Sequence, residues 1–317
     1  MDNNDLRYDT QCKMILADKE YASRILKALA WEYKDISLDE IKDKYLPTDI
    51  RHSVGSILVR PDITGRKRKA RAGEVSFDVR FDCKLPEEHG KNIKLLINIE
   101  GQKSTKTLSY NPVTRGIFYS GVMLSSEYGS IVSDSHYEDL QKVYSIWICM
   151  AKDENREGSI TRFKVYKEHI LGEGEFKETD YDKLEVIIVE LGQIEGESST
   201  AYNEKKLMEL LNYTFSNDEE SDKKIEGLKS RFGIDVSQEL KEDIGTMCDF
   251  SEVIEERGIA KGMEQGIEQG IEKGIEKCAL ETASRLLSMG KLTDEEIASG
   301  TGLTIEQIIE LKEGKAS

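Results

Sequence analysis

The chain has 317 residues, with 45 Lys or Arg against 61 Asp or Glu and a formal net charge of −16 at pH 7. A hydrophobic fraction of 38% with 33% charged residues is typical of one large globular domain, or two smaller ones, with some solvated extensions. No run of about 18 apolar residues occurs, so no membrane-spanning helix is expected, and the polar, acidic residues 1–5 lack the features of a secretion signal.

Cysteine and histidine patterns exclude several kinds of site. The five cysteines are scattered and contain no Cys-x-x-Cys pair, so we expect reduced thiols in a cytoplasmic protein and no zinc site. The four histidines form no His-x-x-x-His pair, which leaves metalloprotease chemistry without a basis. No Gly-x-Ser-x-Gly or Gly-x-x-x-x-Gly-Lys motif occurs either.

Helical and strand patterns alternate through the first 192 residues. Apolar residues recur at helical spacing over residues 20–34 and 38–45. Short apolar runs predict strands at residues 54–59, 75–83, 94–102, 143–150, 160–165 and 184–191. Asn111 followed by Pro112 predicts the start of a further helix that extends to about Ser126. This order predicts an α/β fold in which helices pack on a mixed sheet.

The two predicted strands at residues 75–83 and 94–102 carry acidic side chains. Asp78 lies on the polar face of the first strand, and Glu100 shares a face with Gln102 at the end of the second. If the strands are neighbours, Asp78 and Glu100 come together, and paired carboxylates on rigid strands typically hold a divalent metal. Salt bridges to nearby basic residues are the alternative. Asp82 is four residues further along the same face, roughly 13 Å away, so we expect an edge or loop-mouth charge there.

A basic loop precedes the first of these strands. Six of the twelve residues at 60–71 are basic, and they include Arg66, Lys67, Arg68 and Lys69. Such a loop is suited to holding phosphates, and a solvated surface loop is the equally weighted alternative.

The character of the chain changes after Gly192, which divides the expected domain of residues 1–192 from three helical segments. Residues 193–257 have 17 acidic and 8 basic side chains and are expected to lie outside the core. Residues 258–278 repeat Gly-Ile-Glu every four residues. Residues 279–317 resemble a helix-turn-helix, whose second helix is too acidic to read DNA and suits a protein contact or a cap.

The four-residue repeat has two interpretations. Its apolar stripe drifts about 40° around a helix with each repeat, and each Gly costs about 1 kcal/mol relative to Ala. Close packing at the glycines would support a homo-oligomer, whereas a solvated connector is the alternative that the sequence favours slightly.

An ordered set of motifs resembles a known family. The motifs are residues 76–81, 97–103, 113–119 and 143–150, followed by the Gly-Ile-Glu repeats. Together they are similar to the PD-(D/E)XK nuclease family transposases, the Rpn-type recombination-promoting nucleases. The resemblance implies a restriction-endonuclease-like sheet flanked by helices with a helical C-terminal extension. It also implies a metal-dependent DNA endonuclease of mobile-element type.

The same resemblance implies roles for single residues. Asp78 and Glu100 would be the metal-binding carboxylates for Mg²⁺, with Mn²⁺ as a substitute, and the Gly101 carbonyl a further ligand. Gln102 stands where many relatives carry Lys, and its neutral amide can only orient water or phosphate. A catalytically weak nuclease-fold module that binds DNA or protein is therefore the alternative function, and a protein-assembly factor is a third.

Three more residues are candidates for supporting roles. Arg115 and Tyr119 are four residues apart on a predicted helix, so they share a face, and the resemblance implies that this face contacts DNA phosphate. Helix–sheet packing is the alternative. The resemblance also implies that Glu32 could order a metal-bound water, although the sequence favours a surface charge at that position.

Overall fold

The computed structural model describes most of the chain. The described residues are 3–48, 50, 56–59, 73–76, 79–86, 94–102, 111–128, 132, 136–150, 155–194, 201–216 and 219–313. The chain divides into two compact units, Met1–Glu252 and Val253–Ser317, which we describe separately.

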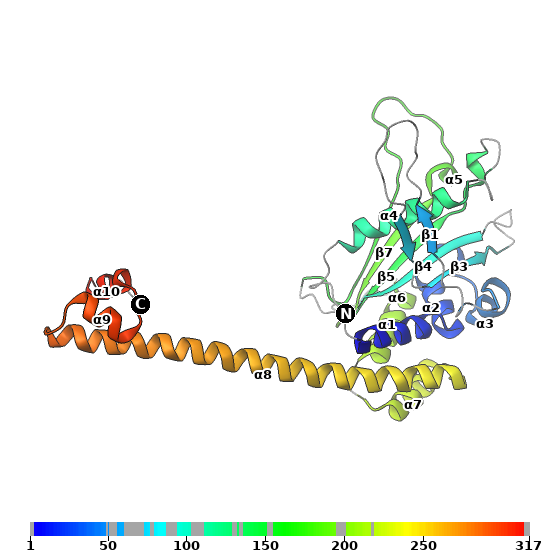
Figure 1. Ribbon diagram of the computed structural model, residues 1–317. Helices are drawn as coiled ribbons and strands as arrows, with labels where there is room; N and C mark the ends of the chain where they lie inside the picture. The colour runs from blue at the N-terminus through cyan, green and yellow to red at the C-terminus, as the bar shows by residue number, and fades with distance from the viewer. Residues whose placement is uncertain are drawn as a thin grey trace. The chain divides into compact units, whose positions relative to one another are not determined.

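A five-stranded mixed sheet forms the centre of the first unit (Figure 1). Its strands are β3 (Val79–Lys84), β4 (Lys94–Gln102), β5 (Val143–Cys149), β6 (Ser159–Lys164) and β7 (Leu184–Glu190). In the order β3-β4-β5-β7-β6, the three middle strands are parallel and both edge strands are antiparallel to their neighbours. Every residue of β5 is buried, which confirms the prediction of a central strand. The predicted α/β fold with a mixed sheet is therefore confirmed.

The predicted strand at residues 75–83 is two strands with different partners. Strand β2 (Gly73–Ser76) pairs antiparallel with β1 (Ser56–Val59) in a separate two-stranded sheet, while β3 joins the main sheet. The two described parts of the predicted strand thus pair with different partners, which the sequence did not reveal because the alternation of side chains does not depend on the partner strand. Within β3, Val79, Phe81 and Cys83 are buried as predicted.

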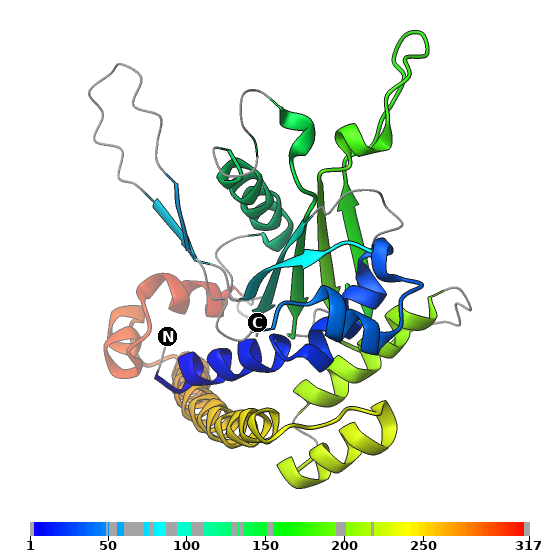
Figure 2. The ribbon, with the colours of Figure 1, turned by 90° about the vertical axis from the view of Figure 1, so that its right-hand side faces the viewer.

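One face of the main sheet is covered by α4 (Pro112–Ser126), as Figure 2 shows. The Asn111 side chain caps the helix by accepting the Val113 N–H at 2.9 Å, and Pro112 occupies the first turn, as predicted. A core forms between this helix and the sheet, with the buried residues Tyr119, Met123, Val143, Trp147, Cys149, Val186 and Ile188.

The opposite face is covered by α1 (Asn3–Leu16), α2 (Lys19–Leu29) and α6 (Tyr202–Phe215). A buried hydrogen bond of 2.8 Å joins the hydroxyls of Tyr21 and Thr214 between α2 and α6. The predicted helix at residues 20–34 ends at Leu29, because Ala30 is extended, and continues as a 3₁₀ turn at Trp31–Tyr33. The next helix, Leu38–Glu40, runs into a π-turn at Ile41–Tyr45, as expected for residues 38–45.

The acidic segment after the sheet belongs to the core. It forms α6, α7 (Ser221–Phe232) and the start of α8 (Gln238–Met289), which bury Leu211, Leu228, Leu240 and Ile244. The expectation that residues 193–257 lie outside the core was therefore wrong. The cause is that acidic side chains on the solvent faces dominate the composition, whereas the leucines on the inner faces do the packing.

The second unit contains the rest of α8 with α9 (Asp294–Thr301) and α10 (Ile305–Lys312). The last two helices begin with capping boxes at Thr293 and Thr304, and a small core joins all three through Ala283, Ile297, Leu303 and Ile308. The expected boundaries at 257/258 and 278/279 both fall within α8, which is one continuous helix. Short helices also occur at Tyr137–Asp139 and Glu178–Tyr181.

No helix among the described residues is both long and apolar enough to cross a bilayer. In the same part of the chain no disulfide joins any of the five cysteines, and Cys83 and Cys149 are buried within their strands.

Candidate active site

Each of the two predicted metal-binding carboxylates is next in the sequence to one member of the paired residues Val79 and Ile99. Val79, the first residue of β3, is opposite Ile99 of β4 in the antiparallel register. Asp78 immediately precedes Val79 in the sequence and lies outside the described residues, as do Arg66, Lys67, Arg68 and Lys69. Glu100, Gly101 and Gln102 are the last three residues of β4, and the structure describes their backbone.

The end of β4 is aligned with the ends of two neighbouring strands. Glu100 pairs with Trp147 of β5, and Gln102 pairs with Cys149, which in turn pairs with Glu190 of β7. These strands are parallel, so their carboxyl ends lie at the same edge of the sheet. In open α/β sheets, ligands usually bind beyond this edge.

Glu190 is a buried carboxylate that sequence reasoning missed. Its side chain is 2% exposed, and Arg156 approaches one carboxylate oxygen at 3.5 Å. The signal was present in the sequence, because Glu190 ends an apolar strand in the same way as Glu100. A buried carboxylate at that position requires partners, and this requirement applies to both residues.

Helix α4 places a guanidinium over the same part of the sheet. The Arg115 guanidinium lies 4.8 Å from the Tyr119 ring centre and 5.7 Å from that of Trp147, and its Nε donates to the Tyr119 hydroxyl at 2.8 Å. Arg115 and Tyr119 therefore share a face, as predicted, and this face meets the sheet at Trp147. Because Trp147 is in register with Glu100, the Arg115 charge and the end of β4 lie in the same region.

Glu32 lies behind the sheet and is not a surface charge. The residue is 7% exposed, and its carboxylate accepts a hydrogen bond of 2.7 Å from the Tyr144 hydroxyl. Tyr144 and Trp147 are three positions apart on β5, so their side chains emerge on opposite faces. The expectation of a surface charge was wrong, because Glu32 and Tyr33 are both buried in the 3₁₀ turn that follows the helix. Burial raises the pKa of Glu32, which Lys142 and Tyr144 only partly offset.

A buried ionic cluster surrounds Lys142 at the start of β5. The Lys142 amine contacts Asp182 at 2.6 Å, Glu185 at 2.8 Å and Glu32 at 3.6 Å. Arg162 also pairs with Glu185. Burial lowers the pKa of Lys142, but the surrounding carboxylates outweigh this effect and the net shift is upward. The cluster is thus a set of mutually compensated charges at the opposite end of β5 from Cys149.

The described residues contain no group of three or more His, Cys, Asp or Glu side chains that could hold a metal ion. The predicted ligands Asp78 and Glu100 fall outside that search, since neither side chain is described. Asp82 is exposed on the edge strand β3 opposite Leu96, which agrees with its expected role as an edge charge.

A pocket of about 800 Å³ opens at the carboxyl ends of β5 and β7. Met150, Leu191 and Gly192 line it from the sheet, and Asn212 lines it from α6. The Asn212 amide fixes this wall by accepting the Gly192 N–H at 3.0 Å and donating to the Gly192 carbonyl at 2.7 Å. The pocket therefore lies at the carboxyl edge of the sheet on the side of α6, the face opposite to α4.

Comparison with protein-family models, with curated proteins and with solved structures finds no match. The family resemblance consequently depends on the sequence motifs alone.

Proposed function

We propose that the protein is a metal-dependent DNA endonuclease whose active site is built on β3 and β4. The pair Val79–Ile99 is the main support. Asp78 precedes Val79 and Glu100 follows Ile99, so the antiparallel register extended by one residue would place them opposite each other. Adjacent positions on paired antiparallel strands are about 5 Å apart, which suits joint binding of one cation. The restriction-endonuclease-like topology belongs to this proposal.

The proposed ligands are the carboxylates of Asp78 and Glu100 and the carbonyl of Gly101. These are oxygen donors, which Mg²⁺ and Mn²⁺ prefer. The bound ion would lower the pKa of a water and neutralise charge on the phosphate. Residues in register share a face of a sheet, so we place the Glu100 carboxylate on the Trp147 face, where Arg115 contributes a positive charge for phosphate.

Two further parts of the chain have roles in this proposal. The Gln102 amide orients water or phosphate by hydrogen bonds, without the charge that a Lys would supply. The basic loop at residues 60–71, with Arg66, Lys67, Arg68 and Lys69, supplies sequence-independent affinity that weakens as salt is raised. Such a loop offsets the repulsion between DNA and a chain of net charge −16.

Plasmid nicking tests the proposal. We expect Asp78→Asn and Glu100→Gln each to lower the nicking rate by at least about 100-fold in Mg²⁺ or Mn²⁺, because each removes a ligand charge from the metal. Asp82→Asn is the matched control, since Asp82 is an exposed carboxylate on the same strand, and it should nick like the wild type. Circular dichroism checks that all variants are folded.

Two outcomes would separate the alternatives. If the double variant Asp78→Asn/Glu100→Gln nicks plasmid as fast as the wild type, the proposed site is wrong. If the wild type binds DNA but shows no cutting that a chelator abolishes, the chain is instead a nuclease-fold binding module.

We also propose that α8 pairs with α8 of a second copy of the chain. The four apolar repeat residues Met263, Ile267, Ile271 and Ile275 are 59–66% exposed, and the intervening glycines have open space around them. A row of side chains four residues apart forms a ridge, and the glycine row beside it forms a groove. Two such helices can pack with the ridge of each in the groove of the other, at an angle of about −50° between their axes. This surface of α8 is therefore complementary to the same surface on a second copy.

A further inference from the structure

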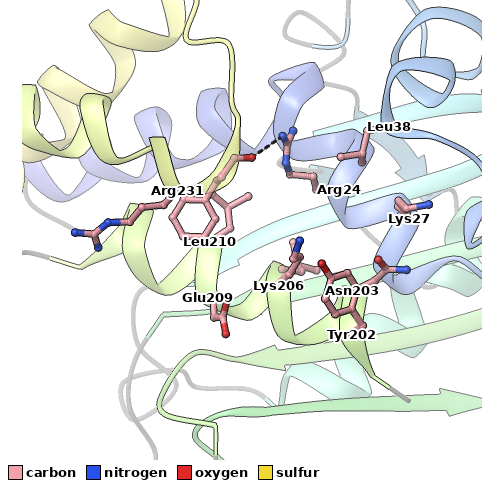
Figure 3. A pocket seen from close by; sticks show the side chains of 11 residues that line it. Arg24, Lys27, Leu38, Tyr202, Asn203, Lys206, Glu209, Leu210 and Arg231 are labelled. Carbon is pink, nitrogen blue, oxygen red and sulfur yellow. Dashed lines mark hydrogen bonds between the residues drawn. The ribbon is translucent and has the colours of Figure 1, made fainter. Parts of the chain in front are cut away.

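A second pocket, of about 270 Å³, lies between α2, α3 (Leu38–Glu40), α6 and the end of α7 (Figure 3). Its lining combines basic side chains with apolar ones: Arg24, Lys27, Leu38, Tyr202, Asn203, Lys206, Leu207, Glu209, Leu210, Arg231 and Phe232. Helices α2 and α6 cover the face of the sheet opposite to α4. The pocket is therefore separate from the proposed cleavage site.

The charge of this lining is opposite to that of the chain. Four cations and one carboxylate line the pocket, whereas the whole chain carries −16. Arg24 is paired with Glu20 and Arg231 approaches Glu219 at 3.9 Å, so the positive charge of the lining comes mainly from Lys27 and Lys206. Lys27 donates to two backbone carbonyls, of Lys34 and Ile36, so no carboxylate among these partners neutralises its charge. Figure 3 shows the Lys206 amine directed from α6 toward Arg24 of α2. A concave site lined this way selects an anion.

Arg24 is held in a fixed orientation. Its guanidinium pairs with Glu20 and donates to the carbonyl of Phe232 at 3.2 Å, which ties α2 to the end of α7. Arg231, by contrast, points away from the other labelled side chains in Figure 3. Lys206 is therefore the cation best placed to contact a ligand directly, and its amine lies 4.4 Å from the centre of the Tyr202 ring.

The remaining lining favours an anion with an aromatic body. Leu207 and Leu210 are buried in the wall of the pocket, and the Tyr202 ring is 63% exposed at its rim. Asn203, beside Tyr202, offers both a donor and an acceptor. A bare inorganic anion would leave this apolar and aromatic surface in contact with water, whereas a ring that stacks on Tyr202 would cover it.

We infer that this pocket binds a nucleoside monophosphate. The phosphate pairs with Lys206, with Lys27 as a second cation, while the base stacks on Tyr202 and hydrogen-bonds to Asn203. A volume of about 270 Å³ is near the lower end of the range for ligand pockets, which favours a single nucleotide over a longer ligand. This inference does not depend on the proposed nuclease function.

Isothermal titration of the full chain with adenosine monophosphate tests the inference. We expect a dissociation constant below about 1 mM for adenosine monophosphate. Adenosine lacks the phosphate and inorganic phosphate lacks the base, so each should bind at least about tenfold more weakly. Lys206→Met should weaken nucleotide binding by about tenfold, since it removes a charge-assisted contact. Lys229→Met is the matched control, because Lys229 is an exposed lysine of α7 that lines neither pocket, and it should leave the affinity unchanged.

Three results would overturn the inference: no nucleotide binding up to about 10 mM, equal affinity for inorganic phosphate, or unchanged affinity in Lys206→Met. Thermal unfolding of both lysine variants checks that they remain folded. Plasmid nicking by the same variants keeps the two proposals distinguishable, because Lys206→Met should nick at the wild-type rate whatever its affinity for nucleotide.

Discussion

At the scale of single residues, Lys142 has the most demanding environment in the described part of the chain. It is 8% exposed and lies among Glu32, Asp182 and Glu185, so these charges depend strongly on one another for stabilisation. A buried ion pair of this kind contributes little relative to apolar packing, but removing one member leaves the rest uncompensated.

Replacing Lys142 with Met should therefore lower the free energy of unfolding by about 3–5 kcal/mol, because Glu32 and Asp182 would lose their cationic partner and only Glu185 would keep one, Arg162. Urea denaturation measures the change. Lys167→Met, at an exposed position after β6 and outside the cluster, is the control, and it should stay within about 0.5 kcal/mol of the wild type. Equal effects of the two substitutions would contradict the ionic role of Lys142.

Sequence reasoning at this scale identified strand-end carboxylates but not their surroundings. Glu100 was found because a charge interrupts an apolar run, and the same rule applied to Glu190 would have found that residue too. Glu32 could not be placed from the sequence, because its burial depends on Tyr144 and Lys142, which are more than 100 residues away.

At the scale of elements, α4 is the helix that positions the candidate site. It approaches the sheet closely at Gly116, where a Cβ atom would lie 2.6 Å from Val186 Cγ1 and 2.8 Å from Trp147 Nε1. Gly121 on the same helix has open space instead. This close approach brings Arg115 over Trp147.

We expect Gly116→Ala to destabilise the protein by about 1–3 kcal/mol, because the added methyl group pushes α4 from the sheet. Gly121→Ala should stabilise it by about 0.5–1 kcal/mol through helix propensity alone. Thermal or urea unfolding of the two variants provides the comparison. If both substitutions change the free energy of unfolding in the same direction, α4 is not in close contact with the sheet at Gly116.

The end of α4 should make stability depend on pH. Burial raises the pKa of Glu127 to about 6, and the hydrogen bond of 2.8 Å from the Gln141 N–H only partly offsets this. Between pH 4.5 and 6 the folded state retains a proton that the unfolded chain has lost. The free energy of unfolding therefore falls as pH rises through this window, by about 2 kcal/mol from this group.

Glu127→Gln removes that titration. Urea denaturation from about pH 4 to 7.5 should show the variant gaining about 2 kcal/mol relative to the wild type as pH rises, with no further gain well above pH 6. A constant difference across the whole range would contradict the buried position of the carboxylate.

Elements were predictable where local rules decide them. Asn111 and Pro112 marked the start of α4, and the all-apolar run of β5 marked a central strand. The division between β2 and β3 was not predictable, because it depends on which strand each one pairs with.

At the scale of the whole molecule, composition was a poor guide to the limits of the core. The leucines of α6 and α7 pack inward although their segment is acidic, so the first unit extends to Glu252 rather than to Gly192. The repeat helix shows the reverse pattern, with isoleucines that are exposed within the chain. An exposed apolar ridge of this length is typical of an interaction surface.

We expect the full chain to have twice the monomer mass in light scattering, and Ile267→Glu with Ile271→Glu to reduce it to the monomer mass. The double substitution places two charges on the proposed contact ridge. Gln265→Glu with Gln269→Glu adds the same two charges at exposed positions on the opposite side of the helix from the ridge and should leave the mass unchanged. A monomeric wild type would refute pairing through α8.

The most direct measurement for the central claim is anomalous diffraction from a crystal of the full chain soaked in Mn²⁺. We predict one strong peak within coordination distance of the carboxylates of Asp78 and Glu100, on the face of the sheet that carries Trp147. Carboxylates that emerge on opposite faces, or a manganese peak bound elsewhere with none between these two residues, would contradict the account.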